Sequence, residues 1–280
     1  MPQTINTNLA SLNAQRNLNA SQSSLSTSMQ RLSSGLRVNS AKDDAAGLAI
    51  AERMNAQVRG MNVAVRNAND GISLAQTAEG ALSKVGDALQ RMRELAVQSR
   101  NATNSSSDKD SLNKEFMELQ KEITRVLGGT TFNGKHILGT DATTLTFQIG
   151  ANVTTDDIIQ IDTVNMATDA DITAVTSGAA IDGAASASAI GTVISDIDTA
   201  LNLINDTRAT FGATQSRFDA IVSNLQQSVE NQAAARSRIM DADYASETAN
   251  MSRAQILQQA GTAMVAQANA LPQQVLKLLG

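Results

Sequence analysis

The chain contains only two prolines, Pro2 and Pro272, so residues 3–271 form one uninterrupted stretch without proline. Proline inside a helix removes a backbone hydrogen bond and clashes with the preceding turn, so its absence removes the strongest helix breaker. A loop-rich enzyme of this size would be expected to carry prolines in its loops. The stretch therefore favours long helices, in a chain whose 280 residues suffice for one large domain or two modest ones.

Apolar residues at the two ends of the chain follow the heptad spacing of coiled coils. Near the N-terminus, Leu25, Met29, Leu32 and Leu36 are separated by four, three and four residues. The last predicted helix covers residues 244–279, and its seam contains Leu257, Met264, Ala268, Leu271, Val275 and Leu278. Both ends are therefore predicted to form coiled-coil-like helices.

The interior of the chain predicts three more helices and a short region of strands. One helical pattern runs from residue 45 to about 100, a second covers 112–126, and a third opens near 191 and continues to about 229. Between them the period changes, because apolar residues alternate with polar ones around Phe147 and Ile159, which predicts two or three short hairpin strands. Residues 166–190 are mostly Ala, Ser, Gly, Thr and Asp, and we expect a solvated loop or weak structure there.

The C-terminal helix lacks the charged face of an ordinary surface helix. No Asp, Glu, Lys, Arg or His occurs from Ala254 through Val275. A lone helix in water usually displays charges opposite its apolar stripe, and isolated helices are marginally stable. We therefore expect the two ends to be poorly ordered in a monomer and to fold against a partner. The alternative is an ordinary coiled coil between the two ends of the same chain.

Composition excludes several classes of function. The chain has no cysteine, which excludes disulfides and thiol catalysis, and its net charge of −5 argues against nucleic acid as the main partner. No phosphate-binding loop, zinc motif or nucleophile motif is present. His136 is interpreted as a turn residue and Asp43-Asp44 as the start of a helix. We predict no enzymatic activity, no cofactor, no metal site, no membrane insertion and no cleaved secretory signal.

Long segments at both ends of the chain resemble bacterial flagellin. The N-terminal half carries RLSSGLRVNSAKDDAAGLAIAERM at 31–54 and QRMRELAVQSRNATNS at 90–105, and the C-terminal part carries SRIMDADYASETANMSRAQILQQAGTAMVAQAN at 237–269. These segments are long and occur in the order expected for the family. The resemblance covers about residues 1–165 and 195–280.

The resemblance implies a mainly α fold of long antiparallel helices and coiled-coil-like terminal helices, with a small β-hairpin region in the middle of the chain. Residues 1–40 and 241–280 would form the inner terminal-helix domain. Residues 41–165 and 190–240 would form a rod domain of long helices and hairpins. Residues 166–189 would be a short variable loop in place of large outer domains.

The resemblance also implies a function and a set of partners. The chain would be an extracellular, self-assembling subunit of the flagellar filament for swimming, exported unfolded through a type III apparatus without a cleaved signal. Its partners would be other copies of itself, an export chaperone on the C-terminal helix, the filament cap and the hook-junction proteins. The alternative within the superfamily is the hook–filament junction protein.

Two sets of residues carry these expectations. For filament assembly they are the apolar positions of the terminal helices: Leu25, Met29, Leu32, Leu36, Leu257, Met264, Leu271, Val275 and Leu278. For recognition by a Toll-like innate receptor, which the resemblance implies, they are the matching positions Gln90, Arg91, Arg93, Glu94, Leu95, Gln98 and Glu115.

Overall fold

The computed structural model of the chain describes the backbone of residues 7–279 and the side chains of residues 7–270. Contacts divide the chain into two compact units. Unit 1 combines residues 1–56 with 230–280, and unit 2 consists of residues 57–229. The domain boundaries were expected near residues 40 and 241, where the chain has its two breaks between long helices. The compact units divide elsewhere, after residue 56 and before residue 230.

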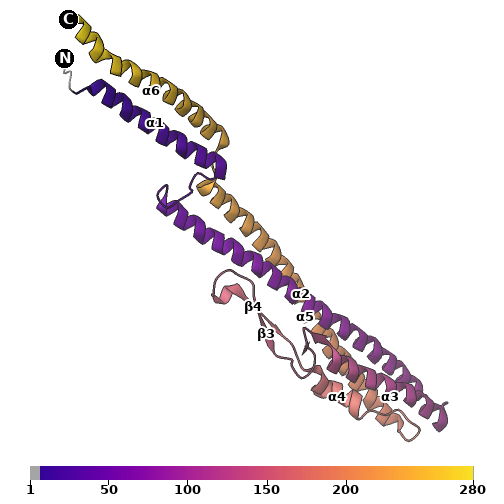
Figure 1. The fold of residues 1–280 in the computed structure, drawn as a ribbon. Helices are drawn as coiled ribbons and strands as arrows, with labels where there is room; N and C mark the ends of the chain where they lie inside the picture. The colour runs from indigo at the N-terminus through magenta and orange to yellow at the C-terminus, as the bar shows by residue number, and fades with distance from the viewer. Residues whose placement is uncertain (1–6, 280) are drawn as a thin grey trace. The chain divides into compact units, whose positions relative to one another are not determined.

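Unit 1 contains the two terminal helices, which lie side by side and antiparallel (Figure 1): α1 (Leu9–Ser34) and α6 (Tyr244–Leu279). Asn8 begins α1, because its side chain accepts a hydrogen bond from the Ser11 amide at 3.0 Å. Gly35 ends it in the left-handed conformation with φ of 72°, which glycine adopts without steric cost. The terminal helices therefore pair within one chain, which is the alternative that the sequence analysis gave to folding against a partner.

A small junction in unit 1 joins the ends of four helices. Leu36 forms a β-bridge with Asp241, and the Ala242 amide donates a hydrogen bond to the Gly35 carbonyl at 2.9 Å. The Arg37 guanidinium donates to the Ile239 carbonyl at 2.7 Å. Since such carbonyls at a helix end lack partners within the helix, Arg37 supplies one of the missing donors. A small apolar cluster forms beneath the junction from Val38, Ala51 and Met240.

Two helices of more than fifty residues contribute to both units: α2 (Ala45–Ser99) and α5 (Ala187–Met240). The predicted helix from 45 to about 100 is therefore confirmed. Asp44 lies just before α2, and its side chain accepts the Gly47 amide at 2.8 Å. The Asp43-Asp44 pair therefore lies at the start of a helix, as the sequence predicted, and Asp44 also caps that helix.

Unit 2 contains the large apolar core. Helix α3 (Ser106–Gly129) begins with a capping box between Ser105 and Asp108 and buries Phe116 and Ile123. The helical parts of α2 and α5 in this unit supply the rest of the helical core, including fully buried Leu82. The core follows the apolar period of the sequence, because each helix buries one stripe and leaves its polar face in water.

Two small hairpins follow α3. Strands β1 (Thr131–Phe132) and β2 (Lys135–His136) are joined by Asn133 and Gly134, both with positive φ, the combination that two-residue hairpins prefer. Strands β3 (Thr144–Gln148) and β4 (Ile158–Asp162) pair antiparallel, with Phe147 opposite Ile159. A short 3₁₀ turn, η1 (Thr155–Asp157), precedes β4. The predicted strand region is confirmed.

For residues 166–190 the sequence predicted a solvated loop or weak structure, and the solvated loop is wrong. This segment contains a 3₁₀ turn, η2 (Met166–Thr168), and a short helix, α4 (Ala170–Ser177). Met166, Ile172, Val175 and Ile181 are buried in the core. Helix α3 supplies hydrogen bonds to two backbone carbonyls of the segment. The buried Gln120 side chain donates to the Val175 and Ala179 carbonyls at 2.7 and 2.9 Å. Four buried apolar residues are therefore enough to pack this segment against the core, although most of its other residues are small.

Candidate functional site

The seam between α1 and α6 is built mostly from small and polar residues. On α6 one set of its positions follows every seventh residue, from Glu247 through Ala254 and Gly261 to Ala268. The half-buried Met251, Gln258 and Val265 alternate with them on the same face. The helices approach closely at its middle, where a Cβ added to Gly261 would lie 3.1 Å from Leu18 Cδ1. Leu18 and Leu25 of α1 are only half-buried. The pair therefore buries little large apolar surface.

Polar groups connect the two helices at both ends of the seam. At one end, Ser11 Oγ donates to Asn269 Oδ1 and Asn8 Nδ2 donates to the Ala268 carbonyl, each at 2.7 Å. At the other end, the buried Glu247 carboxylate accepts hydrogen bonds from Ser28 and Arg31. These contacts lie about twenty residues apart along each helix, so they bracket the whole described seam.

Glu247 is the one buried ionisable residue in the described part of the chain. Its carboxylate accepts a hydrogen bond from Ser28 Oγ and an ion-paired hydrogen bond from the Arg31 guanidinium, both at 2.9 Å. The Arg31 hydrogen bond, with a smaller contribution from Ser28, lowers the pKa of Glu247 against the opposing effect of burial. The charged form of Glu247 is therefore the form that the seam binds.

The apolar positions predicted for assembly fall into three groups. Leu25, Leu32 and Leu36 are half-buried beside the seam or junction. Three others are exposed: Met29 by 55%, Leu257 by 51% and Met264 by 62%. The side chains of Leu271, Val275 and Leu278 lie outside the described residues.

Leu257 and Met264, which the heptad pattern placed on the apolar seam of the C-terminal helix, do not line the contact between α1 and α6. Each lies three residues after a seam residue, about 60° further round α6, and faces away from the pair. The prediction took the largest apolar residues as the seam. The sequence also contains a second heptad at Glu247, Ala254 and Gly261. The small side chains at Ala254 and Gly261 allow the two helices to approach closely.

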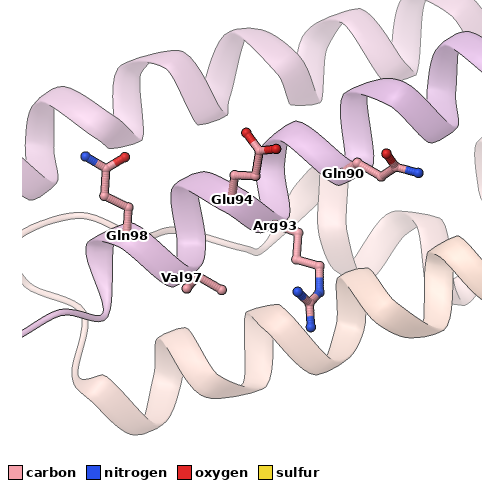
Figure 2. Close-up of a pocket in the computed structure, with 5 residues that line it drawn as sticks. All are labelled: Gln90, Arg93, Glu94, Val97 and Gln98. Carbon is pink, nitrogen blue, oxygen red and sulfur yellow. The ribbon is translucent and has the colours of Figure 1, made fainter.

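The predicted recognition residues lie on α2 and α3 of unit 2. Gln90, Arg93, Glu94 and Gln98 line a hollow of about 500 Å³ together with the half-exposed Val97, which the prediction missed (Figure 2). Arg91 is exposed beside them and Glu115 faces it from α3.

Leu95 does not belong to the exposed patch. Its side chain is fully buried in the unit 2 core. Leu95, which the resemblance placed in the recognition set, is therefore not accessible beside Arg91. A spacing of four residues puts the two on adjoining strips of the helix, and the core covers the strip of Leu95. Leu95 supports the patch from beneath.

Ion pairs organise the patch. Arg91 donates to Glu115 and to Glu94, each at 2.8 Å, and Arg93 donates to Asp198 of α5 at 2.6 Å. Figure 2 shows Arg93 reaching from α2 toward the neighbouring helix. The hydrogen bond to Glu115 raises the pKa of Arg91, and the one to Asp198 raises the pKa of Arg93. These groups offer a charged surface with a short apolar strip at Val97.

Other candidate chemistry takes structural roles. His136 is half-buried in the β1–β2 hairpin, and its backbone amide donates to Asp141 at 3.0 Å. Within the described residues, no group of three or more His, Cys, Asp or Glu side chains is arranged to hold a metal ion. A search of the described helices also finds none that is long and apolar enough to cross a membrane.

Comparison with known proteins identifies relatives over the whole chain. Family models for the bacterial flagellin N-terminal helical region and C-terminal helical region match residues 5–143 and 194–279. A flagellin of Halalkalibacterium halodurans is 45% identical, covering 98% of this chain and 99% of the relative. A flagellin of Bacillus subtilis is 42% identical with the same coverage. A crystal structure of Bacillus cereus flagellin is similar with a TM-score of 0.49 at 33% identity, covering 61% of this chain and 94% of that one.

Proposed function

The chain belongs to the bacterial flagellin family, whose members are structural subunits of the flagellar filament, and we propose that it polymerises through the exposed faces of its terminal helices. The membership makes it a structural protein of the filament and not an enzyme.

The observation that carries the assembly proposal is the apolar surface left on the terminal pair. Met29, Leu257 and Met264 are each more than half exposed. Leu9 and Ile256 of the same two helices are each 66% exposed. Burying such a side chain contributes about 1.5–3 kcal/mol, so a helix pair that leaves several in water retains a strong tendency to associate. A filament uses this tendency through repeated, non-closing contacts between subunits.

Salt-induced polymerisation followed by negative-stain electron microscopy tests the assembly surface. The test variant is Leu257→Gln with Met264→Gln, which preserves helix propensity and removes two apolar side chains. The matched control is Met117→Gln on α3, since Met117 is 46% exposed but lies outside the terminal pair. We expect the test variant to raise the critical concentration at least tenfold and the control to leave it unchanged. Equal assembly of both variants would overturn the proposal.

The parent chain also separates the two superfamily functions. Long uniform filaments are the expected result. Short rings or caps that do not extend, even with seeds, would favour the hook–filament junction function instead. Truncation at Ala254 should abolish filaments, because it removes the exposed residues of α6.

Export and chaperone binding complete the proposed path to the filament. The chain would leave the cell unfolded, and the absence of cysteine supports this because no disulfide can obstruct an unfolded chain. An export chaperone would hold α6 as a helix in a groove, covering Leu257 and Met264 until the chain leaves the cell. Pull-down of the chain and its Ala254 truncation with the cognate chaperone tests this: only the intact chain should bind.

The patch on α2 and α3 is the proposed surface for a Toll-like innate receptor, while the filament cap and hook-junction proteins would contact the assembled ends. Charged groups around Arg91 and Glu115 offer oriented hydrogen bonds to a partner. Arg91→Asp places a third carboxylate beside Glu94 and Glu115 and should weaken both receptor signalling and assembly. A variant that signals and assembles normally would exclude a role for Arg91.

A further inference from the structure

Residues 175–183 of unit 2 form a strap that begins in the last turn of α4 and leads toward α5. Side chains from two other helices bind this strap at five backbone atoms. Three of these side chains belong to α3, namely Asp110, Asn113 and Gln120, and the fourth is Ser99 at the end of α2. Directed hydrogen bonds therefore fix the strap in addition to its buried apolar residues.

The three polar side chains of α3 lie on one face of that helix. Asp110, Asn113 and Gln120 are separated by three and seven residues, spacings that return to the same side of an α-helix. Asp110 Oδ1 accepts a hydrogen bond from the Gly183 amide at 2.9 Å. A Cβ added to Gly183 would lie 2.7 Å from the Ser106 Cβ, so the strap passes too close to α3 for any side chain at this position.

Ile181 of the strap connects α3 with α2. Its amide donates to Asn113 Oδ1 at 3.0 Å, and its carbonyl accepts a hydrogen bond from Ser99 Oγ at 2.6 Å. Ile181 and Ser99 are both 0% exposed, so water cannot take the place of the Ser99 hydroxyl. A buried backbone group without its partner is costly, and directed hydrogen bonds restrict a separation more narrowly than apolar contacts do. Ile181 therefore ties the end of α2 to α3 at a defined distance.

This connection lies beside the charged patch on α2 and α3. Ser99 directly follows the patch residue Gln98, which Figure 2 shows near the end of α2, and Asn113 lies two residues before Glu115. The ion pair between Arg91 and Glu115 crosses from α2 to α3 at 2.8 Å. It lies about 12 Å from Ser99 along the axis of α2. A change in the separation of the two helices would therefore move the charged groups of the patch apart.

We propose that Ile181 is a bridge that sets the separation of α2 and α3 at the recognition patch, with Ser99 and Asn113 as its two positioning residues. A partner that contacts both helices binds more tightly when their separation is already fixed, because less ordering is needed on binding. The inference rests on the proposed function for its purpose, since the separation matters for recognition only if a receptor binds the patch. The separation itself is a property of unit 2 and can be measured without the receptor.

Spin labels measure the separation directly, because the chain has no cysteine of its own. Gln98→Cys with Glu118→Cys places nitroxide labels at exposed positions of α2 and α3. The test variant is Ser99→Ala with Asn113→Leu, which removes both hydrogen bonds to Ile181, keeps side chains of similar shape and introduces two good helix formers. Double electron–electron resonance should give a distance distribution at least twice as broad as in the parent. Ser99→Ala alone, a milder change, should give an intermediate width.

Binding to the ectodomain of the Toll-like receptor is measured on the unlabelled chains. The test variant should bind at least tenfold more weakly than the parent. Asn113→Asp keeps an acceptor for the Ile181 amide and should bind within twofold of the parent. The matched control is Ile159→Val, which removes a buried methyl group from β4 in the same unit. It should lower stability in urea but leave both receptor binding and the label distances unchanged.

Two results would overturn the bridge. A distance distribution like that of the parent in Ser99→Ala with Asn113→Leu would show that the apolar core alone sets the separation. An equal loss of receptor binding in this variant and in Ile159→Val would show that binding follows stability and not the bridge. If the parent chain itself binds no receptor, the proposed recognition fails, while the label distances still decide whether Ile181 sets the separation.

Discussion

Unit 2 and the terminal helix pair of unit 1 are both made of long helices, yet they bury different side chains. In unit 2, Phe116, Phe211 and Phe218 are each at most 1% exposed. The terminal pair instead buries serines, alanines and one glutamate, and leaves Met29 and Met264 largely in water. Unit 2 thus obtains its hydrophobic stabilisation within one chain. The terminal pair leaves apolar surface in water, and this surface is the one proposed to contact other chains.

The largest expected difference between the two regions is the loss of unfolding free energy when a large apolar side chain is truncated. Phe218 lies at the centre of the unit 2 core, with its ring edge-on to Phe147 at a centroid distance of 5.7 Å. Phe218→Ala should lower the free energy of unfolding by about 3–5 kcal/mol, since a cavity remains. Met264→Ala should change it by less than about 0.5 kcal/mol in the monomer, because an exposed side chain loses little on truncation. Urea denaturation checks both, and equal losses would contradict the comparison.

Two glycines of α2 test how tightly unit 2 is packed. A Cβ added to Gly71 would lie 2.7 Å from Phe218 Cζ, whereas Gly80 has no neighbour within 4 Å of that position. Gly71→Ala should therefore destabilise the protein by about 1–3 kcal/mol through overpacking. Gly80→Ala should stabilise it by up to about 1 kcal/mol through helix propensity. Thermal unfolding gives both signs, and a stabilising Gly71→Ala would show that the core around Phe218 is loosely packed.

Acid should destabilise the terminal helix pair before it destabilises the unit 2 core. The pKa of Glu247 is lower in the folded protein than in the unfolded chain, because Arg31 and Ser28 bind the charged form. Its contribution to stability is therefore complete above the ordinary glutamate pKa of about 4.3 and is lost as the pH falls through the lower folded value. The described buried polar residues of unit 2, Ser99, Gln120 and Thr163, do not titrate in this range.

Hydrogen exchange measured between pH 5 and pH 2.5 checks this prediction, once corrected for the intrinsic pH dependence of exchange. Protection of α1 and α6 should fall before protection of the unit 2 core. Glu247→Gln should remove most of the pH dependence of the terminal pair. Simultaneous loss in both regions would mean that Glu247 does not govern the pair at low pH.

The smallest expected effect concerns the surface of unit 2. Arg93 and Asp198 form a 2.6 Å ion pair, but both side chains are nearly half exposed. Arg93→Gln should cost less than about 1 kcal/mol in unfolding free energy, since solvent screens exposed pairs. Any loss of receptor binding by this variant would then report on the patch and not on folding. A large destabilisation in urea would show that the pair holds α2 against α5.

Sequence reasoning predicted the helices well because their signals are local. The limits of α6, the start of α2 just after Asp43-Asp44 and the strands around Phe147 and Ile159 all followed from period, charge and turns. It failed for residues 166–189, where Ile172 and Val175 are buried by contact with helices distant in the chain. The inclusion of Leu95 among the accessible recognition residues was wrong for the same reason. Two adjoining strips of one helix differ in exposure only when a neighbouring helix covers one of them.

The sequence by itself determined that this chain forms long proline-free helices with heptad ends, and its motifs were sufficient for the family. Which face of α6 meets α1 was decided only by the tertiary structure. The reason is physical: Leu257 and Gly261 belong to overlapping heptads of the same helix, and periodicity ranks the larger side chains first. The buried Glu247, bound by Ser28 and Arg31 from the other end of the chain, is seen only when the helices lie together.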